Sequence, residues 1–303
     1  NAVRAYGVEA SRRVWQFSAQ RSCKQLIGAL SEHGLIQPGY HRPKIKPHPA
    51  PTFYHAGDIG DVIYALPVIK AMGGGDLILG NQLDLPLGLR PRSGIGKETF
   101  EWFRPLLEAQ PYLRSVTWSA TVPEVDYDLN EFRLYWKSRT SENLKACPLG
   151  SRQFTLTWLH AARLGITKLD EGDPWLTAPA KQIKSKPVII ARSFRYRNPL
   201  FPWNKILKEY RGKILFVGLP EEHADFVRKF GRVPYRPART ALELASLLAG
   251  CRLFVGNASA PGAIAQGLGV NCIFETRCDG HPTDIIINRK TSQYGATFNL
   301  PKL

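Results

Sequence analysis

The sequence has no apolar run that approaches the roughly 20 residues needed to cross a bilayer. It also has no cysteine pattern, because its five cysteines are odd in number and widely spaced, which fits neither a disulfide framework nor a metal-binding motif. Short internal repeats and low-complexity tracts are lacking too. These absences exclude a disulfide scaffold and a repeat array, and they favour a cytoplasmic protein with no transmembrane segment and no resident metal.

Acidic residues are scarce as well: 25 Asp and Glu face 41 Lys and Arg, a net charge of +16. The excess is partly local, since residues 1–50 hold eight Lys or Arg against two Glu, a net charge of +6. Such a balance favours a polyanionic partner, namely a nucleic acid, a phosphorylated glycolipid or a nucleotide. A merely basic surface is an equally acceptable interpretation, because net charge governs association and not fold.

The 303 residues suffice for two medium-sized domains, and the prolines divide the chain. Residues 1–51 predict a basic helical extension that ends in a proline-rich linker. An N-terminal Rossmann-like domain is predicted over 52–178, and a C-terminal Rossmann-like domain over 185–303.

Strand and helix patterns alternate in both halves. In the first half, strands are predicted at 53–55, 77–79, 115–118 and near 127, and helices at 100–109 and 154–164. In the second half, strands are predicted at 188–190, 214–217, 253–255 and 272–274, and helices at 203–210, 221–230, 241–248 and 261–267. This alternation predicts two mostly parallel sheets, with ligands bound in a cleft at the carboxyl ends of the strands.

The most informative segment is the turn that follows the first predicted strand, from His55 to Asp61. A glycine turn leading from a strand into a helix leaves free backbone N–H groups at the helix N-terminus, as in nucleotide-binding units. Here Asp61 stands where a phosphate would dock. Its carboxylate either caps the helix or faces the cleft as a general base, and the local sequence leaves both roles open.

Motifs in both halves support a more specific interpretation. They are Gly60-Asp-Val-Ile63 with Ala65-Leu-Pro67, the helix Thr240–Ala249, Leu253-Phe-Val-Gly-Asn257 and Ala265-Gln-Gly-Leu-Gly-Val270. In this order and spacing, over roughly residues 52–275, they resemble the ADP-heptose:lipopolysaccharide heptosyltransferase family. The resemblance implies an α/β fold of the GT-B type, in which two Rossmann-like domains face each other across a cleft, with 52–178 as the acceptor domain and 185–303 as the nucleotide-sugar domain. In this fold the chain end often crosses back onto the first domain, here after about residue 285.

The sequence departs from the family's pattern directly after Asn257. Ala258 stands where the family carries an acidic residue, and Ala263 stands near the position of a histidine on the following helix. Two groups expected to meet the donor are therefore replaced. This implies a divergent branch with its own donor sugar and acceptor.

The resemblance implies inverting transfer of a sugar from a nucleotide-sugar, which serves as co-substrate while no cofactor stays permanently bound. By the motif match, Asp61 is the base that removes the proton of the acceptor hydroxyl, and Asp58 is the alternative carboxylate. His55 and Gly60 belong to the same turn and are expected on the acceptor side.

The departing diphosphate needs positive charge, which we expect after the first strand of the second domain. Arg192, Arg195 and Arg197 would lie on one side of an extended loop and contact phosphate; a solvated loop is the alternative. The other residues assigned to the donor are Ser193, Gly218, Asn257, the helix start Ser259-Ala260-Pro261-Gly262, and Glu275 for the ribose. Tight packing explains the helix start equally well, and a surface position explains Glu275.

Two other patterns mimic known sites. Gly94–Thr99 resembles the end of a phosphate-binding P-loop but lacks its first glycine and its Ser/Thr. Asp126-Tyr-Asp128 has the spacing of a metal-binding Asp-x-Asp, but it falls late in the first α/β unit. We expect neither to be functional.

The nature of the acceptor divides the functional interpretations. A hydroxylated base in modified, phage-type DNA is the favoured acceptor, because the chain is strongly basic and lacks residues typical of the lipopolysaccharide enzymes. An envelope lipopolysaccharide or glycan is the alternative acceptor. A non-catalytic module that binds nucleotides or nucleic acid is the third interpretation, and Asp61 together with the arginine loop argues against it.

Overall fold

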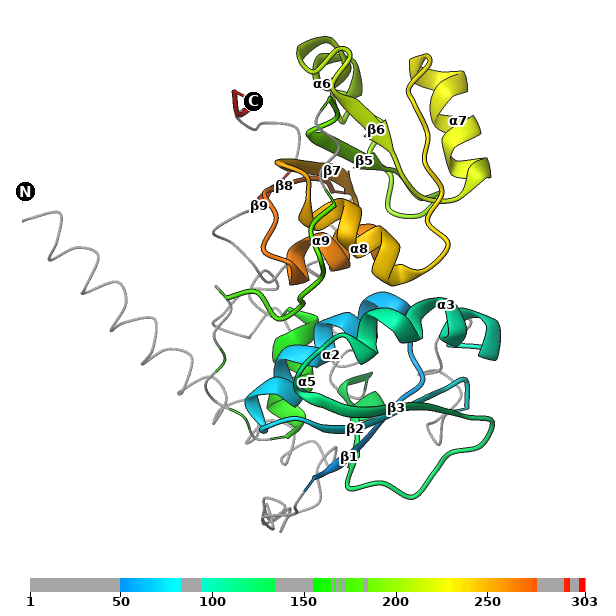
Figure 1. Cartoon of the computed structure of the whole chain (residues 1–303), viewed down its shortest axis with the longest axis vertical. Coiled ribbons are helices and arrows are strands. Elements are labelled where there is room, and N and C mark those ends of the chain that lie inside the picture. Colours follow the sequence, from blue (N-terminus) through cyan, green and yellow to red (C-terminus); the bar gives the residue numbers. More distant parts are fainter. Residues whose placement is uncertain are drawn as a thin grey trace, which may run out of the picture.

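The protein consists of two α/β units stacked along its long axis (Figure 1). The computed structural model describes residues 50–82, 94–133, 155–164, 166, 169, 173–181, 185–276, 292–294 and 300–302. The predicted basic extension therefore lies almost entirely outside the described residues. The α/β prediction with two Rossmann-like parallel sheets is confirmed.

The N-terminal unit is a four-stranded parallel sheet with strand order β3-β2-β1-β4. Its elements are β1 (Thr52–His55), α2 (Ile59–Ala71), β2 (Gly75–Gly80), α3 (Lys97–Glu108), β3 (Leu113–Ser119), β4 (Tyr127–Asp128), the 3-10 helix η2 (Leu129–Glu131) and α5 (Leu156–Arg163). Because β1 and β4 are parallel neighbours, the residues that follow them meet at the same edge of the sheet.

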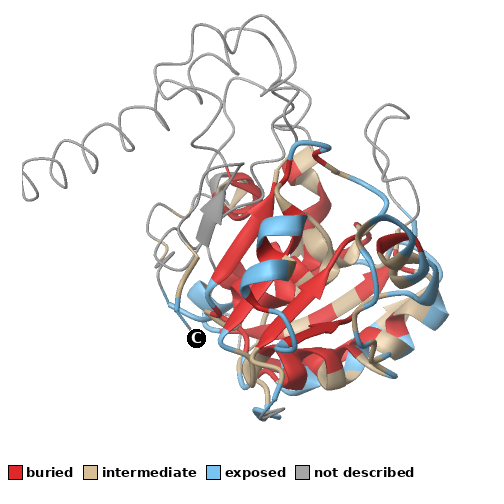
Figure 2. Cartoon of the chain, turned by 90° about the horizontal axis from the view of Figure 1, so that it is seen from above, coloured by how far each residue is buried: buried red, intermediate tan, exposed pale blue. Residues whose placement is uncertain are grey.

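The C-terminal unit is a five-stranded parallel sheet with strand order β6-β5-β7-β8-β9. Its elements are β5 (Val188–Ala191), α6 (Trp203–Glu209), β6 (Ile214–Phe216), α7 (Pro220–Phe230), α8 (Ala241–Ala249), β7 (Leu253–Asn257), α9 (Ala260–Gly267), β8 (Cys272–Glu275) and β9 (Ser292–Tyr294). Every residue of β5, β7 and β8 is buried, as expected for parallel strands covered on both faces (Figure 2).

The expected crossing of the chain end onto the first domain is not observed in the described residues. Strand β9 instead extends the C-terminal sheet by pairing with β8. Beyond it, Leu300 packs against the core of the C-terminal unit, and the Pro301 carbonyl accepts a hydrogen bond from the Tyr210 hydroxyl at 2.8 Å. Without β9, β8 would be the edge strand of the described sheet, so its outer side can pair with a further strand. The sequence pattern at 292–294 is a weak strand signal, so this pairing was not predicted.

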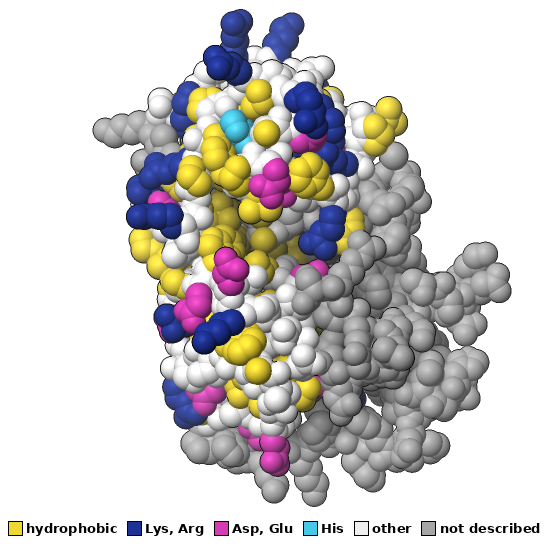
Figure 3. All heavy atoms as spheres, turned by 90° about the vertical axis from the view of Figure 1, so that its right-hand side faces the viewer, with side chains coloured by type: hydrophobic (Ala, Val, Ile, Leu, Met, Phe, Trp, Pro, Cys, Tyr) yellow, Lys and Arg dark blue, Asp and Glu magenta, His cyan; other side chains and the backbone are white. Residues whose placement is uncertain are grey.

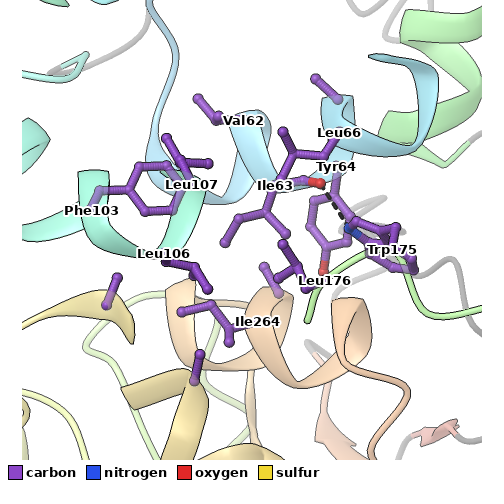
Figure 4. Packing of buried hydrophobic residues seen from close by; sticks show 14 of the residues in the cluster. Val62, Ile63, Tyr64, Leu66, Phe103, Leu106, Leu107, Trp175, Leu176 and Ile264 are labelled. Atoms are coloured by element: carbon purple, nitrogen blue, oxygen red, sulfur yellow. Dashed lines mark hydrogen bonds between the residues drawn. The ribbon is translucent and has the colours of Figure 1, made fainter. Parts of the chain in front are cut away.

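One hydrophobic cluster spans the two units, and a second lies within the C-terminal unit. Helix α2 packs on α9, and α3 packs on α8. Ile63 of α2 lies against Ile264 of α9, with Leu106 and Leu176 beside them (Figure 4). The segment 173–181 contributes Trp175, at 3% exposure, and Leu176 to this shared cluster. It connects the units as a strap that is anchored by these two buried residues, while most of its other residues are exposed.

Trp175 also supplies a hydrogen bond that is missing within α2. Pro67 lies inside this helix and has no N–H, so the carbonyl of Ile63 four residues earlier has no helical partner. The Trp175 indole N–H donates to that carbonyl at 3.0 Å (Figure 4). Packing and hydrogen bonding at one residue thus join the strap to the first helix.

Candidate active site

The turn between β1 and α2 is held by buried side chains. The Ala56 N–H donates to Asn130 Oδ1 at 2.8 Å, and the Gly57 N–H donates to His55 Nδ1 at 2.9 Å. A Cβ on Gly57 would lie 2.5 Å from His55 Cε1 and 2.7 Å from Asp61 Oδ2. The absence of a side chain at Gly57 therefore lets the Asp61 carboxylate approach the turn.

The two oxygens of Asp61 have different surroundings. Oδ2 accepts hydrogen bonds from Arg133 Nη2 at 2.5 Å and from the Asp58 N–H at 3.3 Å. Oδ1 accepts no hydrogen bond from any described residue, and the side chain is 20% exposed. Burial raises the pKa of Asp61 even though the charge of Arg133 opposes the effect. The carboxylate thus caps the helix through one oxygen and is available as a base through the other.

Asp58 and Gly60 border Asp61 on the outer side of the turn. Asp58 is the N-cap residue of α2, and its side chain, 30% exposed, pairs with Arg195 at 3.4 Å. Gly60 lies in the first turn of α2, and a Cβ there would meet nothing within 4 Å. The space beside Gly60 is therefore open to a second molecule.

His55 is not placed to touch substrate, which corrects the expectation for it. Its side chain is fully buried, and its Nε2 lies 3.2 Å from His160 Nε2. His160 Nδ1 lies 2.7 Å from the Leu156 carbonyl and must donate to it, so His160 Nε2 accepts from His55. Both rings are neutral in this arrangement, and burial lowers the pKa of His160 to about 3 and that of His55 well below its usual value. His55 supports the turn.

The N-termini of α2 and α9 lie at the same end of the interface between the units. Ile63 and Ile264 are each the fifth residue of their helix, and they face each other. At the other end, Lys70 donates to the Pro174 carbonyl at 3.1 Å, and Gly269 approaches the same proline. The helices are therefore parallel, and their positive dipole ends point to one place.

The start of α9 offers backbone donors but is also tightly packed. Ser259 is the N-cap residue without capping the helix, because its hydroxyl donates to the Asn257 carbonyl at 3.1 Å. Ala260 and Pro261 begin the helix at intermediate exposure. A Cβ on Gly262 would lie 2.9 Å from both the Asn257 carbonyl oxygen and Phe274, so this glycine is required for packing.

The three arginines of the loop after β5 point to three different places, which corrects the prediction that they share one side. Arg192 is buried and forms a two-pronged ion pair with Glu275, at 2.8 and 2.7 Å. Glu275 is also buried and accepts from the Asn198 N–H and the Trp203 indole. Neither Arg192 nor Glu275 is available to bind a nucleotide-sugar, because the two buried charges neutralise each other.

Arg197 is also committed within the C-terminal unit. Its Nε donates to the Ser193 carbonyl at 2.8 Å, and its Nη1 donates to Asp225 of α7 at 2.7 Å. Between the arginines, Tyr196 adopts φ 58°, a left-handed conformation that is uncommon for this residue type. This kink breaks the extended geometry on which the prediction depended.

Arg195 is the arginine that the loop presents at the junction of the units. Its side chain is 50% exposed, and it reaches across the junction to Asp58. Its backbone is fixed, because Asn257 Nδ2 donates to the carbonyls of Ser193 and Arg195 at 3.0 and 2.6 Å. Asn257 Oδ1 accepts from the Ser193 N–H at 3.0 Å. Asn257 and Ser193 therefore hold the loop.

Gly218 has a conformational role. Its φ of 126° is reserved almost entirely for glycine, and a Cβ would lie 2.8 Å from Glu222 Oε2. Its carbonyl accepts from the Tyr235 hydroxyl at 3.0 Å. The residue shapes the turn that begins α7.

Arg133 is the site residue that sequence reasoning missed. It follows η2, and β4 before η2 lies beside β1 in the sheet. The only sequence signal was the weak strand pattern near Tyr127, whose position next to β1 is decided by the sheet order. Asn130, which holds the turn, follows the same strand and was missed for the same reason.

The two mimicking patterns have structural roles. Asp126 Oδ2 accepts from the Thr52 N–H at 2.8 Å, and Asp128 Oδ1 accepts from the Asn130 N–H at 2.9 Å. Gly94–Gly96 leads into α3. Within the described part of the chain, no group of three or more His, Cys, Asp or Glu side chains could hold a metal ion. The described helices include none that is both long and apolar enough to cross a membrane.

Comparison with known proteins finds similarity at the level of structure. No protein-family model matches the sequence, and no curated protein sequence matches it. A glycosyl transferase family 9 structure from Veillonella parvula DSM 2008 is 12% identical with a TM-score of 0.48, over 74% of this chain and 79% of that one. E. coli heptosyltransferase WaaC, solved with ADP-2-deoxy-2-fluoro heptose, is 13% identical with a TM-score of 0.43, over 80% and 92%. E. coli ADP-heptose lps heptosyltransferase II is 12% identical with a TM-score of 0.45, over 80% and 89%.

Proposed function

We propose that this chain is a metal-independent, inverting glycosyltransferase that moves a sugar from a nucleotide-sugar to a hydroxyl group. The observation that carries the proposal is the Asp61 carboxylate. One of its oxygens is held by Arg133 and the Asp58 N–H, and the other, in the first turn of α2, accepts no hydrogen bond from a described residue. The motifs that contain Asp61 and Asn257 resemble glycosyltransferases of the same chemistry.

In the proposed reaction, Asp61 Oδ1 takes the proton of the acceptor hydroxyl as the acceptor oxygen attacks the anomeric carbon. The bond between that carbon and the diphosphate oxygen breaks, and direct displacement inverts the configuration. The raised pKa of Asp61, caused by its burial, suits a base, because the basicity of the carboxylate increases with its pKa.

The leaving diphosphate would bind at the start of α9. The backbone N–H groups of Ala260 and Gly262 are not capped by Ser259, and the dipole of the helix favours an anion. Arg195, whose carbonyl accepts a hydrogen bond from Asn257 two residues before Ser259, would exchange its contact with Asp58 for a phosphate oxygen. Arg197, Ser193 and Asn257 would keep the loop in place for this contact.

The favoured acceptor is a hydroxylated base in modified DNA. Its support is electrostatic. Residues 185–276 hold 14 Lys or Arg against six acidic residues, a net charge of +8, and Lys and Arg side chains spread over this upper unit in Figure 3. Residues 50–164 hold 12 Lys or Arg against 12 acidic residues, a net charge of zero. A polyanion would therefore be held mainly by the C-terminal unit.

The test of the reaction is Asp61→Asn. The amide keeps an oxygen for the Asp58 N–H but cannot accept a proton, so release of nucleoside diphosphate from a panel of nucleotide-sugars should fall by a factor of about a hundred or more. Nucleoside diphosphate affinity and melting temperature should stay close to those of the parent protein. Asp76→Asn, on the remote end of the same sheet, is the matched control. Undiminished turnover in Asp61→Asn, or no nucleotide binding by the parent protein, would refute the proposal.

The test of the acceptor uses duplex DNA that carries a hydroxymethylated base. Binding is measured across a salt series, and affinity should fall steeply because each phosphate contact contributes about 0.9 to the logarithmic slope. Replacing the exposed Lys205, Lys208 and Arg211 with Gln should reduce that slope. If DNA does not bind even at low salt, the acceptor is an envelope glycan.

A further inference from the structure

We propose that Arg133 is a positioning residue for the base: it holds Asp61 Oδ2 so that Oδ1 alone is presented to the acceptor hydroxyl. The proposal rests on the proposed function for its kinetic consequence, but its structural consequence can be measured without any activity. It assigns a role to a residue that lies outside the motifs that suggested the reaction.

The ion pair between Arg133 and Asp61 is largely shielded from solvent. Arg133 is 15% exposed, and its guanidinium lies 4.9 Å from the centre of the Phe132 ring. Phe132 is itself buried and lies 4.2 Å from the His160 ring. A planar guanidinium held over an aromatic ring has fewer orientations available, so the oxygen that it binds is held as well.

The groups around Asp61 leave Arg133 as the cation that balances it. The turn after β1 contributes His55 and α5 contributes His160, and the hydrogen bonds of both rings keep them neutral. The start of α2 contributes Asp58, a second negative charge. Arg163 of α5 is bound to Glu131 of η2. Among the described residues, Arg133 is therefore the basic side chain in direct contact with Asp61.

The hydrogen bonds of the Asp61 carboxylate determine which of its two oxygens can accept a proton. A proton on Oδ2 would face the N–H groups of Arg133 and Asp58, which are both donors. A proton on Oδ1 meets no donor of a described residue. The acceptor proton must therefore go to Oδ1, and rotation of the carboxylate would cost both hydrogen bonds to Oδ2.

The decisive measurement is the titration of Asp61 by carbon NMR in protein labelled at the aspartate carboxyl carbons, with Asp61→Asn used for assignment. Removing the positive charge in Arg133→Met should raise the pKa of Asp61 by about one unit or more, because a neighbouring arginine favours the ionised carboxylate. Arg133→Lys keeps the charge and should move the titration less. Arg163→Met, which breaks an ion pair on the same side of the unit, should leave it unchanged. An unchanged titration in Arg133→Met overturns the proposal.

The kinetic measurement separates positioning from a merely structural role. In Arg133→Met, kcat should fall on the order of a hundredfold at pH values where Asp61 is ionised, while the KM of the donor stays the same. The acid limb of the pH profile should move to higher pH. Arg133→Lys should recover the position of that limb but not the full rate, since a single ammonium does not fix the oxygen as a stacked guanidinium does. If Arg133→Met does not fold, Arg133→Lys still tests the rate loss. A shifted titration in a protein without transfer activity would refute the proposed function and leave the role of Arg133 intact.

Discussion

At the scale of single residues, the site is defined by which polar groups are already bound. Glu275 and Arg192 have the right chemistry for a nucleotide-sugar but neutralise each other in the core. Arg195 is the loop arginine that remains at the surface, and its partner Asp58 is itself part of the site. Residue type alone therefore overestimates a binding site, because burial and pairing decide which groups remain for a ligand.

The neutral histidine pair predicts an acid sensitivity of folding. Burial lowers the pKa of His160 to about 3, so the unfolded chain, with a pKa near 6.5, binds the proton more readily. The free energy of unfolding is therefore at its full value with respect to this histidine above pH 6.5, and it falls as the pH decreases from there toward 3. Each such histidine contributes up to about 1.4 kcal/mol per pH unit to this slope.

The measurement is urea unfolding of the parent protein and of His160→Gln between pH 4 and pH 8. The free energy of unfolding of the parent should fall more steeply with decreasing pH, because the variant has lost one of the two buried imidazoles. Parallel curves for the two proteins would show that the pair does not titrate on unfolding.

At the scale of elements, hydrophobic patterns were a sound guide. The strands at 188–190, 253–255 and 272–274 could be predicted because β-branched and aromatic residues fill short buried runs, and the structure confirms all three. Helix α2 was predictable from its apolar spacing even though Pro67 interrupts it, since Trp175 supplies the missing donor. That compensation comes from 112 residues away in the sequence, and local reasoning could not find it.

The loop after β5 shows why the site was predicted less well than the fold. Arginines at alternate positions point to the same side of a loop only if its backbone is extended. Tyr196, at φ 58°, interrupts the extended backbone of this loop. The candidate base Asp61 was predictable because a strand, a glycine turn and a helix place it locally. Its partner Arg133 was not, because their contact spans 72 residues and depends on the sheet order.

The two glycines of the turn give a matched prediction at this scale. Gly57→Ala should destabilise the protein and suppress transfer, because its Cβ would lie 2.5 Å from His55 and 2.7 Å from the Asp61 carboxylate. Gly60→Ala should keep the fold and gain roughly 0.5–1 kcal/mol, since alanine is the better helix former and its Cβ meets nothing.

Thermal unfolding and nucleotide-sugar turnover of both variants provide the check. A Gly57→Ala protein as stable and active as the parent would mean that the turn can relax around the extra methyl group. A stable but inactive Gly60→Ala would place a substrate in the open space beside α2.

At the scale of the whole molecule, the two sheets do not behave as separate bodies. One apolar cluster contains residues of α2, α3, α8, α9 and the strap, and the candidate site lies at its edge. Asp61 stands on one unit and Arg195 on the other, so the relative position of the units sets the distance between the proposed base and the proposed phosphate contact. Because the apolar cluster includes residues of both units, we expect them to unfold in a single cooperative transition.

Trp175 is the residue by which this coupling can be measured. Trp175→Phe keeps an aromatic ring against Tyr64 but removes the indole donor, which leaves the Ile63 carbonyl buried without a partner. The expected loss of stability is about 1–3 kcal/mol, the usual cost of an unsatisfied buried acceptor. The loss should appear in the one transition of the whole protein, as followed by calorimetry.

A double-mutant cycle with Pro67→Ala identifies the cause of that loss. Alanine at position 67 restores a backbone N–H four residues after Ile63, so the carbonyl gains a helical partner and no longer needs the indole. The cost of Trp175→Phe should therefore be smaller by about 1 kcal/mol in the Pro67→Ala background, and the cavity left by the proline ring cancels in the comparison. Equal costs in the two backgrounds would show that Trp175 acts through packing alone. Two separate calorimetric transitions in any of the four proteins would contradict cooperative unfolding through the shared cluster.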